Sequence, residues 1–284
     1  MRPWSTVLRI PTDTGDLWFK ANMSAQAYEA AVVQILAERR PDLVPRLLAV
    51  EPERGWMLQV DGGELLRGLV DGTDHGVWVE ILPRYAELQI DLTGDQGRLL
   101  ATGAPDRRLV GLPAQFEELA ARAENLGLSA EEAAGVRGLV PRVAHLGDQL
   151  AALGLAETIQ HDDLHDGQVF VQDGRFLFFD WGDSCVSHPF FTLLVTFAVL
   201  AHRLGVELES SDLDRFRDAY LEPWTQFRPL DELRPAIPSA LWMGSVCRAL
   251  SWDRIVSALP SPYHEQEADT VPERLRWLLG WREA

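Results

Sequence analysis

Residues 161–183, HDDLHDGQVFVQDGRFLFFDWGD, place six aspartates and two histidines around two apolar runs. The Asp-Gly pair at positions 173 and 174 separates these runs, which is a strong signal for a β-hairpin. The hairpin would bring Asp163, before its first strand, close to Asp180, after its second strand. Two neighbouring carboxylates repel each other unless a cation or a shared proton lies between them. The segment therefore predicts a site built around a cation.

Three chemistries could use carboxylates arranged in this way. Zinc binding by His161 and His165 is disfavoured, because a spacing of four positions brings two side chains to one face only on a helix, and here a glycine and a strand follow. Glycoside hydrolysis also needs two carboxylates, but it gives no role to the amide of Gln168. Phosphoryl transfer needs a carboxylate to accept a hydroxyl proton and oxygen ligands that hold magnesium against nucleotide phosphates. The residues favour phosphoryl transfer over the other two chemistries.

The first sixty residues predict a small β-rich unit with one helix. A helix is expected from the N-cap Ser24 to the residues before Pro41, because apolar residues recur there at helical spacing. Two hairpins are expected around it, and the second ends at the Asp-Gly-Gly string 61–63. The expected strands are residues 5–10, 17–22, 46–51 and 55–60.

The rest of the chain has helical periodicity, interrupted only by the 161–183 segment. Ser129 opens a string with capping-box spacing, and Pro141 is expected to separate two helices. Pro83 lies inside an apolar helical pattern and predicts either a kink or a late start. We therefore expect an α+β chain of two lobes, a β-rich lobe of residues 1–62 and a mainly helical lobe of residues 63–284 that carries the hairpin.

The strings HDDLHDGQVFV and FFDWGD resemble the catalytic segment of the aminoglycoside phosphotransferase and choline/homoserine-kinase-like family. That family has His-Gly-Asp-Leu-His-x-x-Asn, then a hairpin, then Ile-Asp-Trp. Upstream, WFKAN supplies Lys20 and the following helix supplies Glu29, similar to the family's strand lysine and helix glutamate. The resemblance covers most of the chain in order. It implies a bilobal protein-kinase-like fold, ATP and Mg²⁺ as cofactors, and transfer of the γ-phosphoryl group to a hydroxyl of a small molecule.

The resemblance also implies a role for each matching residue. Asp163 corresponds to the catalytic base, and Gln168 and Asp180 to the magnesium ligands. Lys20 and Glu29 correspond to the clamp on the nucleotide phosphates. A lysine suits this role because it presents a compact charge to phosphate oxygens, and a glutamate on the next helix can fix its position.

Other residues would support this site. The nucleotide is expected between the lobes, with its adenine at the break from Gln59 to Asp61. His161 is expected to hold the loop by hydrogen bonds, and His165 is expected to do the same rather than to act in catalysis. Asp183 could face the metal or cap the next helix.

Three departures from the family pattern stand out. Gln168 replaces asparagine, and its side chain is one methylene longer, although magnesium demands near-octahedral ligands at short distances. Asp162 replaces glycine, so we expect that this position does not need a positive φ. The strand that normally precedes residues 5–10 is expected to be missing, which would leave a poorer cover over the phosphates.

The composition is that of a globular protein with an acidic surface. The chain has 284 residues, with 26 lysines and arginines against 43 aspartates and glutamates, a net charge of −17. This charge should repel nucleic acid and anionic membranes and favour cationic small molecules or metal ions. The sequence has neither a membrane-length apolar run nor a signal peptide, so we expect a cytoplasmic protein. Cys185 and Cys247 lie in apolar surroundings and are expected to be buried thiols.

Two functions follow from these residues. The first is an ATP-dependent phosphotransferase whose acceptor is a small-molecule alcohol, such as an aminoglycoside-like or other cationic alcohol. The second is a degenerate kinase-like module that binds nucleotide without transferring phosphate, which the glutamine at position 168 favours. The sequence leaves the acceptor, the choice of ATP or GTP, and the oligomeric state open.

Overall fold

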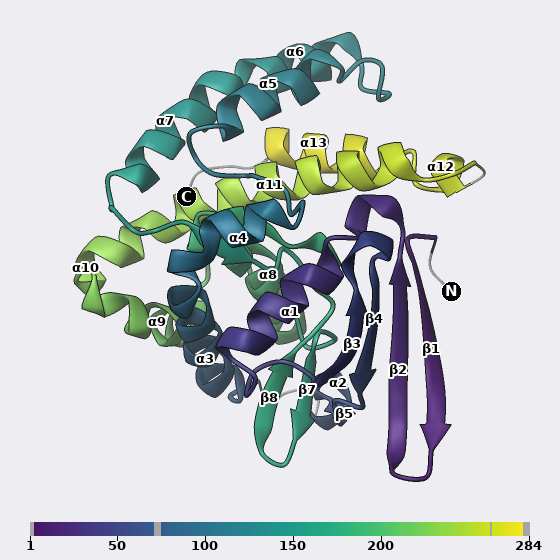
Figure 1. The fold of residues 1–284 in the computed structure, drawn as a ribbon. Helices are drawn as coiled ribbons and strands as arrows, with labels where there is room; N and C mark the ends of the chain where they lie inside the picture. Colours follow the sequence, from purple (N-terminus) through teal and green to yellow (C-terminus); the bar gives the residue numbers. More distant parts are fainter. Residues whose placement is uncertain (1–2, 71–74, 262, 281–284) are drawn as a thin grey trace.

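A computed structural model describes residues 3–70, 75–261 and 263–280 (Figure 1). It contains a small antiparallel sheet with one helix packed against it and a larger, mainly helical part. The prediction of an α+β, bilobal fold is therefore confirmed. Among these residues, no helix is long and apolar enough to cross a membrane.

The sheet of the first lobe has the strand order β1-β2-β4-β3, with antiparallel neighbours throughout. The first hairpin is longer than predicted, because β1 continues to Thr12 and only residues 13–14 form the turn. Trp18 and Lys20 are two positions apart in β2, so their side chains lie on the same face of the sheet. The strands are β1 (Ser5–Thr12), β2 (Gly15–Asn22), β3 (Leu47–Glu51) and β4 (Trp56–Val60).

The helix of this lobe, α1 (Glu29–Arg39), begins later than predicted. Ser24 does not cap it, because Ser24–Gln26 form a separate short 3-10 turn. The amide of the buried Gln26 donates a hydrogen bond to Asp183 in the second lobe at 2.8 Å. This contact draws the turn toward the second lobe, and the helix begins only after it.

The second lobe carries the predicted hairpin, β7 to β8 (Figure 1). Asp173 and Gly174 both have positive φ, 50° and 73°, as a two-residue turn of this kind requires. The hairpin prediction is confirmed. A short strand that follows the first lobe pairs with β7, and two further strands pair with each other. These strands are β5 (Glu64–Leu65), β6 (Thr158–Gln160), β7 (Val169–Gln172), β8 (Arg175–Phe178) and β9 (Cys185–Ser187).

Helix α11 forms the centre of the helical lobe, and α5, α7, α8 and α13 pack on it (Figure 1). It is buried along most of its length. The helices after α1 are α2 (Leu66–Leu69), α3 (Trp78–Asp91), α4 (Gln96–Ala101), α5 (Leu112–Ala121), α6 (Ala130–Gly138), α7 (Val140–Ala151), α8 (Leu193–Leu204), α9 (Asp214–Leu221), α10 (Leu230–Leu233), α11 (Ile237–Ala258), α12 (Tyr263–Gln266) and α13 (Thr270–Gly280).

Local signals in the sequence account for several of these boundaries. Ser129 caps α6 through a complete capping box, and Pro141 lies in the first turn of α7, just after α6 ends. Both predictions are confirmed. Pro83 lies inside α3, which begins at Trp78, so the late start is wrong. Cys185 and Cys247 are buried free thiols, as predicted.

Candidate active site

The base of the β7–β8 hairpin brings the predicted carboxylates into one region. Asp163 lies in the loop that enters β7, and Asp180 lies just after β8. The N–H of Phe179 donates to the carbonyl of Gln168 at 3.2 Å, which joins the two loops. Asp180 has a left-handed conformation, with φ of 63°, and leads into the 3-10 turn Trp181–Asp183. The two loops therefore face each other at the open end of the hairpin.

Lys20 joins the two lobes by contacting a carboxylate in each. Its Nζ is 2.7 Å from Oε2 of Glu29 and 2.5 Å from Oδ1 of Asp180. Asn22 donates from Nδ2 to Glu29 at 2.7 Å. Burial opposes the charge on Lys20, but Asp180 and Glu29 outweigh it and raise the pKa of Lys20 above its ordinary value. Burial likewise opposes ionisation of Asp180, and Lys20 lowers the pKa of Asp180.

Asp163 is bound on both carboxylate oxygens. Nη2 of Arg248 lies 2.6 Å from Oδ1, and Nε2 of Gln168 donates to Oδ2 at 3.1 Å. Burial tends to raise the pKa of Asp163, but Arg248, together with His165, holds it well below its usual range. A carboxylate stabilised in this way is a permanent hydrogen-bond acceptor, suited to orienting a hydroxyl group.

The sequence reasoning missed Arg248, which lies 85 positions after Asp163 on α11. A signal for it was present, because Arg248 is the one charged residue between positions 237 and 252. A charged side chain inside a buried helix is normally paired. The apolar pattern of α11 predicts an ordinary core helix, and the sequence does not indicate which loop its arginine contacts.

Asp162 has φ of 62°, so the prediction that this position does not need a positive φ is wrong. The left-handed conformation is held by its neighbours. Its carbonyl accepts from Nη1 of Arg248 at 2.7 Å, and its Oδ1 accepts from Nε2 of Gln160 at 2.9 Å. Aspartate tolerates this region better than most residues. The position thus combines a left-handed backbone with a buried carboxyl group.

Asp183 contacts both lobes rather than capping a helix. Its Oδ1 accepts from Gln26 at 2.8 Å, and its Oδ2 accepts from Nη1 of Arg248 at 2.9 Å. The residues after it continue into β9, which removes the capping alternative. Gln26 is a second contact residue that the sequence reasoning missed, because the pattern placed it inside a regular helix.

His161 lies on the inner side of the loop that enters β7. It is fully buried, its Nε2 is 2.8 Å from the carbonyl oxygen of Phe179, and its ring lies 4.6 Å from that of Trp181. Burial lowers the pKa of His161, so the ring is neutral near pH 7. These contacts give His161 a structural position between the two loops.

His165 lies at the outer side of the same loop, beside Asp166. The N–H of Gly167 donates to Nδ1 of His165 at 2.9 Å. Asp166 is buried and paired with Arg67 at 2.9 Å and with Arg203 at 2.5 Å. The sequence reasoning did not single out Asp166, whose two arginines come from α2 and α8. The loop is therefore anchored by charge on both sides.

Gln59 and Asp61 lie at the end of β4, where the chain leaves the first sheet. Gln59 lies opposite Trp18 in the strand register. Both oxygens of Asp61 accept hydrogen bonds within the protein, from Nε1 of Trp18 at 2.7 Å and from the N–H of Gly63 at 2.8 Å. The partners of Asp61 are therefore Trp18 and Gly63, whereas those of Lys20 are Glu29 and Asp180.

Gln168 and Asp180 offer one amide oxygen and one carboxylate to a metal ion. Gln168 uses its nitrogen on Asp163, which directs its oxygen elsewhere. Magnesium in kinases is usually held by one or two protein oxygens, with phosphates and water supplying the rest. The described residues contain no group of three or more His, Cys, Asp or Glu side chains placed to hold a metal. The donor set therefore fits a magnesium ion that arrives with phosphates.

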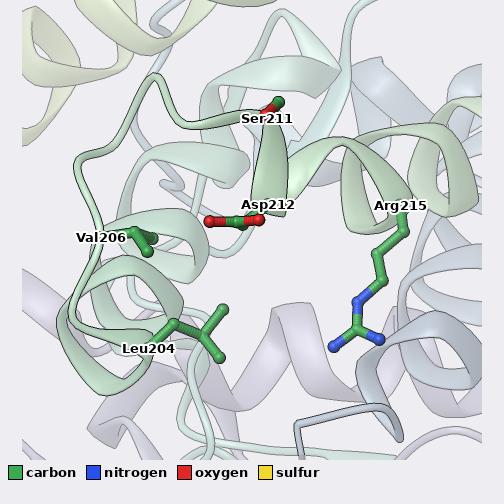
Figure 2. A pocket seen from close by; sticks show the side chains of 5 residues that line it. All are labelled: Leu204, Val206, Ser211, Asp212 and Arg215. Carbon is green, nitrogen blue, oxygen red and sulfur yellow. The ribbon is translucent and has the colours of Figure 1, made fainter.

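Residues of α8, α11 and α13 line a cavity of about 740 Å³. Arg248, which holds Asp163, is part of its wall. A second cavity, of about 450 Å³, lies at the end of α8, and Figure 2 shows Asp212 and Arg215 facing the same space as the apolar Leu204. None of the carboxylates at the hairpin base lines this second cavity.

Comparisons with known proteins agree with this geometry. The Plasmodium vivax ethanolamine kinase structure is similar over 96% of this chain and 78% of its own, with a TM-score of 0.64 and 12% identity. A choline/ethanolamine kinase family protein from Mesorhizobium loti is similar over 97% and 88%, with a TM-score of 0.60 and 17% identity. At these identities the likeness shows the fold alone.

The sequence itself gives the family. No curated protein matches the chain. Residues 4–232, which span both the Lys20 cluster and the hairpin base, match the sequence profile of the phosphotransferase enzyme family. The chain therefore belongs to the phosphotransferase enzyme family.

Proposed function

We propose that this protein transfers the γ-phosphoryl group of ATP to a hydroxyl of a small molecule. The observation that carries the proposal is the contact of Lys20 with both Glu29 and Asp180, at 2.7 and 2.5 Å. It places a permanent cation at the meeting point of the lobes, where the phosphates of a bound nucleotide would lie. A lysine fixed by a helix glutamate is the usual phosphate contact of kinase-like sites.

The nucleotide would bind with its phosphates toward Lys20 and its adenine toward Gln59 and Asp61. The boundary between the two lobes would lie near residue 62. The next strand, β5, already pairs with the hairpin of the second lobe. Asp180 and Gln168 would hold Mg²⁺. This ion, when bound, neutralises the charge of the phosphates. Lys20 would then exchange its contact with Asp180 for a phosphate oxygen.

Asp163 would orient the acceptor hydroxyl. Its low pKa makes it a weak base in the ground state, so it accepts the proton only as the oxygen forms its bond to phosphorus. The cavity beside Arg248 lies on the side from which an acceptor could approach. His161 and His165 would keep the loop in shape without exchanging protons with the substrate.

The second candidate function is binding of nucleotide without transfer. The specific observation in its favour is that Arg248 and Gln168 together occupy both oxygens of Asp163. Transfer requires that one of these contacts yields to the acceptor hydroxyl. If neither yields, the protein binds ATP and forms no phosphorylated product.

Replacement of Asp163 separates the two functions. Asp163→Asn should lower the rate of ATP turnover by about 10²- to 10⁴-fold, the usual effect of losing a general base. ATP binding should change little, since Asp163 does not contact Lys20 in the structure. Steady-state release of ADP measures the first quantity, and calorimetry measures the second.

Asp173→Asn is the matched control. Asp173 lies at the tip of the same hairpin, its side chain is 85% exposed, and asparagine tolerates its positive φ. This variant should keep wild-type turnover. Equal turnover in Asp163→Asn and Asp173→Asn would remove Asp163 from the reaction, and absence of turnover in the wild type with bound ATP would favour the binding module.

A further inference from the structure

The wall of the cavity beside Arg248 contains more basic than acidic side chains, unlike the molecule as a whole. The chain carries a net charge of −17, but the wall of this cavity contains three arginines, Arg203, Arg248 and Arg274. His202 and the exposed Glu273 are its other titratable groups. Global charge favours cations in the surrounding solution, whereas a buried ligand is selected by the groups it contacts.

Two of the arginines are already paired within the protein. Arg203 contacts Asp166 at 2.5 Å, and Arg248 contacts Asp163 and Asp183 at 2.6 and 2.9 Å. These pairs fix the two guanidinium groups at the wall. The carboxylates behind them largely balance their charges. These two arginines therefore help to shape the cavity but add little net charge to it.

Arg274, on α13, is different. Within the described residues it makes no ion pair, and its Nε is buried without a hydrogen-bond partner. Its guanidinium packs over the ring of Trp252 at 5.3 Å. Burial and the nearby Arg248 lower the pKa of Arg274 to about 10, although Asp162, Asp163 and Asp183 act in the opposite direction. The group is therefore still charged at neutral pH. Arg274 is half-buried, and a guanidinium outside any ion pair can still bind an anionic group of a ligand.

Apolar side chains make up much of the remaining wall. Leu194, Val195 and Val199 of α8 face the cavity, and Trp277 of α13 closes part of it. A cavity of about 740 Å³ is large enough for a ligand with an apolar body. Apolar side chains beside an arginine that makes no ion pair among the described residues suit a molecule with an anionic end and an apolar remainder.

We infer that the phosphoryl acceptor is an anionic, partly apolar alcohol, whose carboxylate or phosphate group pairs with Arg274. The part of this inference that concerns phosphorylation rests on the proposed function, whereas the binding of an anionic ligand at Arg274 does not. Arg274 is a specificity-determining residue in this account. A cationic alcohol, the acceptor that the acidic composition suggests, would meet a like charge in this cavity.

Binding of three matched probes tests the inference without nucleotide. The probes share the body PhCH₂CH(OH)– and end in a carboxylate (3-phenyllactate), a neutral CH₂OH group, or a CH₂NH₃⁺ group. The phosphate ester of the neutral probe is a fourth member that distinguishes a phosphate from a carboxylate. Calorimetry should show at least one anionic probe bound about tenfold more tightly than the cationic probe, the effect expected of one charge-assisted hydrogen bond.

Variants of Arg274 assign the preference to this residue. Arg274→Gln should lose the tenfold advantage of the anionic probe and leave the neutral probe unchanged, and Arg274→Lys should recover part of it. Arg276→Gln is the matched control, because Arg276 lies on the same helix but pairs with Glu132 at 2.8 Å outside the cavity. The affinity for the neutral probe shows that each variant keeps a folded cavity.

The outcomes separate this inference from the proposed function. Tighter binding of the cationic probe, or no anionic probe bound at millimolar concentration, overturns the inference. An anionic preference that survives in Arg274→Gln also overturns the role of Arg274. Selective binding of an anionic probe without phosphorylation in the presence of Mg²⁺ and ATP supports the inference and counts against the transferase, whereas phosphorylation of the cationic probe alone does the reverse.

Discussion

The two carboxylates at the base of the hairpin are neutralised in different ways. Asp180 is paired with Lys20 from the other lobe, and its side chain is 46% exposed. Asp163 is paired with Arg248 from the same lobe, in a group where Arg248 is only 9% exposed and also holds Asp183. The first pair lies where a ligand could exchange with it. The second pair is more buried, and it joins the loop that contains Asp163 to α11.

This difference predicts that one pair contributes mainly to nucleotide binding and the other mainly to the stability of the fold. A buried ion pair contributes little net stability by itself, but removal of one partner leaves an uncompensated charge. An exposed partner can be rehydrated instead. We therefore expect Arg248 to matter more for folding, and Lys20 to matter more for the nucleotide.

The largest expected effect on stability is that of Arg248→Met. It leaves Asp163 and Asp183 without their cation, and breaking a buried pair costs about 3–5 kcal/mol. Urea unfolding at pH 7 measures this loss. Arg122→Met, which removes a pair with Asp253 where Arg122 is 47% exposed, should cost less than about 1 kcal/mol.

The pH dependence of the same pair has a definite sign. The pKa of Asp163 is lowered in the folded state, so its contribution is present above the unfolded pKa of about 3.9 and is lost as the pH falls below it. The difference between wild type and Arg248→Met should therefore shrink below about pH 4. An unchanged difference there would locate the effect in packing rather than in charge.

Lys20→Met should show the opposite balance. We expect a loss of about 1–3 kcal/mol in stability, smaller than for Arg248→Met, because Asp180 can be hydrated. Burial raises the pKa of Glu29, so without Lys20 this buried carboxylate can take up a proton, and Asn22 still donates to it. Affinity for ATP should fall by about tenfold or more, the effect of losing one charge-assisted contact. Titration calorimetry measures the affinity for ATP, and urea unfolding measures the stability. A larger loss of ATP affinity in Arg248→Met than in Lys20→Met would contradict the expected division of roles.

The smallest expected effect is a gain in stability from Asp162→Asn. Burial raises the pKa of Asp162 to about 7, so the folded state binds a proton that the unfolded state releases, and stability falls as pH rises from about 4 to 7. Asparagine tolerates the positive φ and removes this titration. The variant should be about 1–2 kcal/mol more stable than wild type at pH 8 and not at pH 4. Thermal unfolding at the two pH values measures it.

Local chemistry made much of this structure predictable. The Asp-Gly turn at 173–174, the cap at Ser129 and the break at Pro141 are decided by residues within a few positions of each other. The contact of Lys20 with Glu29 joins neighbouring elements, and the resemblance to a known family identified both residues.

The remaining features depend on contacts between distant segments. Arg248 reaches Asp163 across 85 positions, and its helix has the pattern of an ordinary core helix. The start of α1 is shifted because Gln26 contacts Asp183, 157 positions away. Asp162 keeps a left-handed backbone because Arg248 binds its carbonyl. Patterns within short windows carry no information about such partners.

Calorimetric titration of the protein with ATP, with and without Mg²⁺, tests the central claim most directly. If Lys20 and Asp180 form a nucleotide site, ATP should bind more tightly with Mg²⁺, and Asp180→Asn should remove the magnesium dependence while Asp173→Asn keeps it. Absence of ATP binding, or a magnesium dependence that survives in Asp180→Asn, would contradict the assignment of this site.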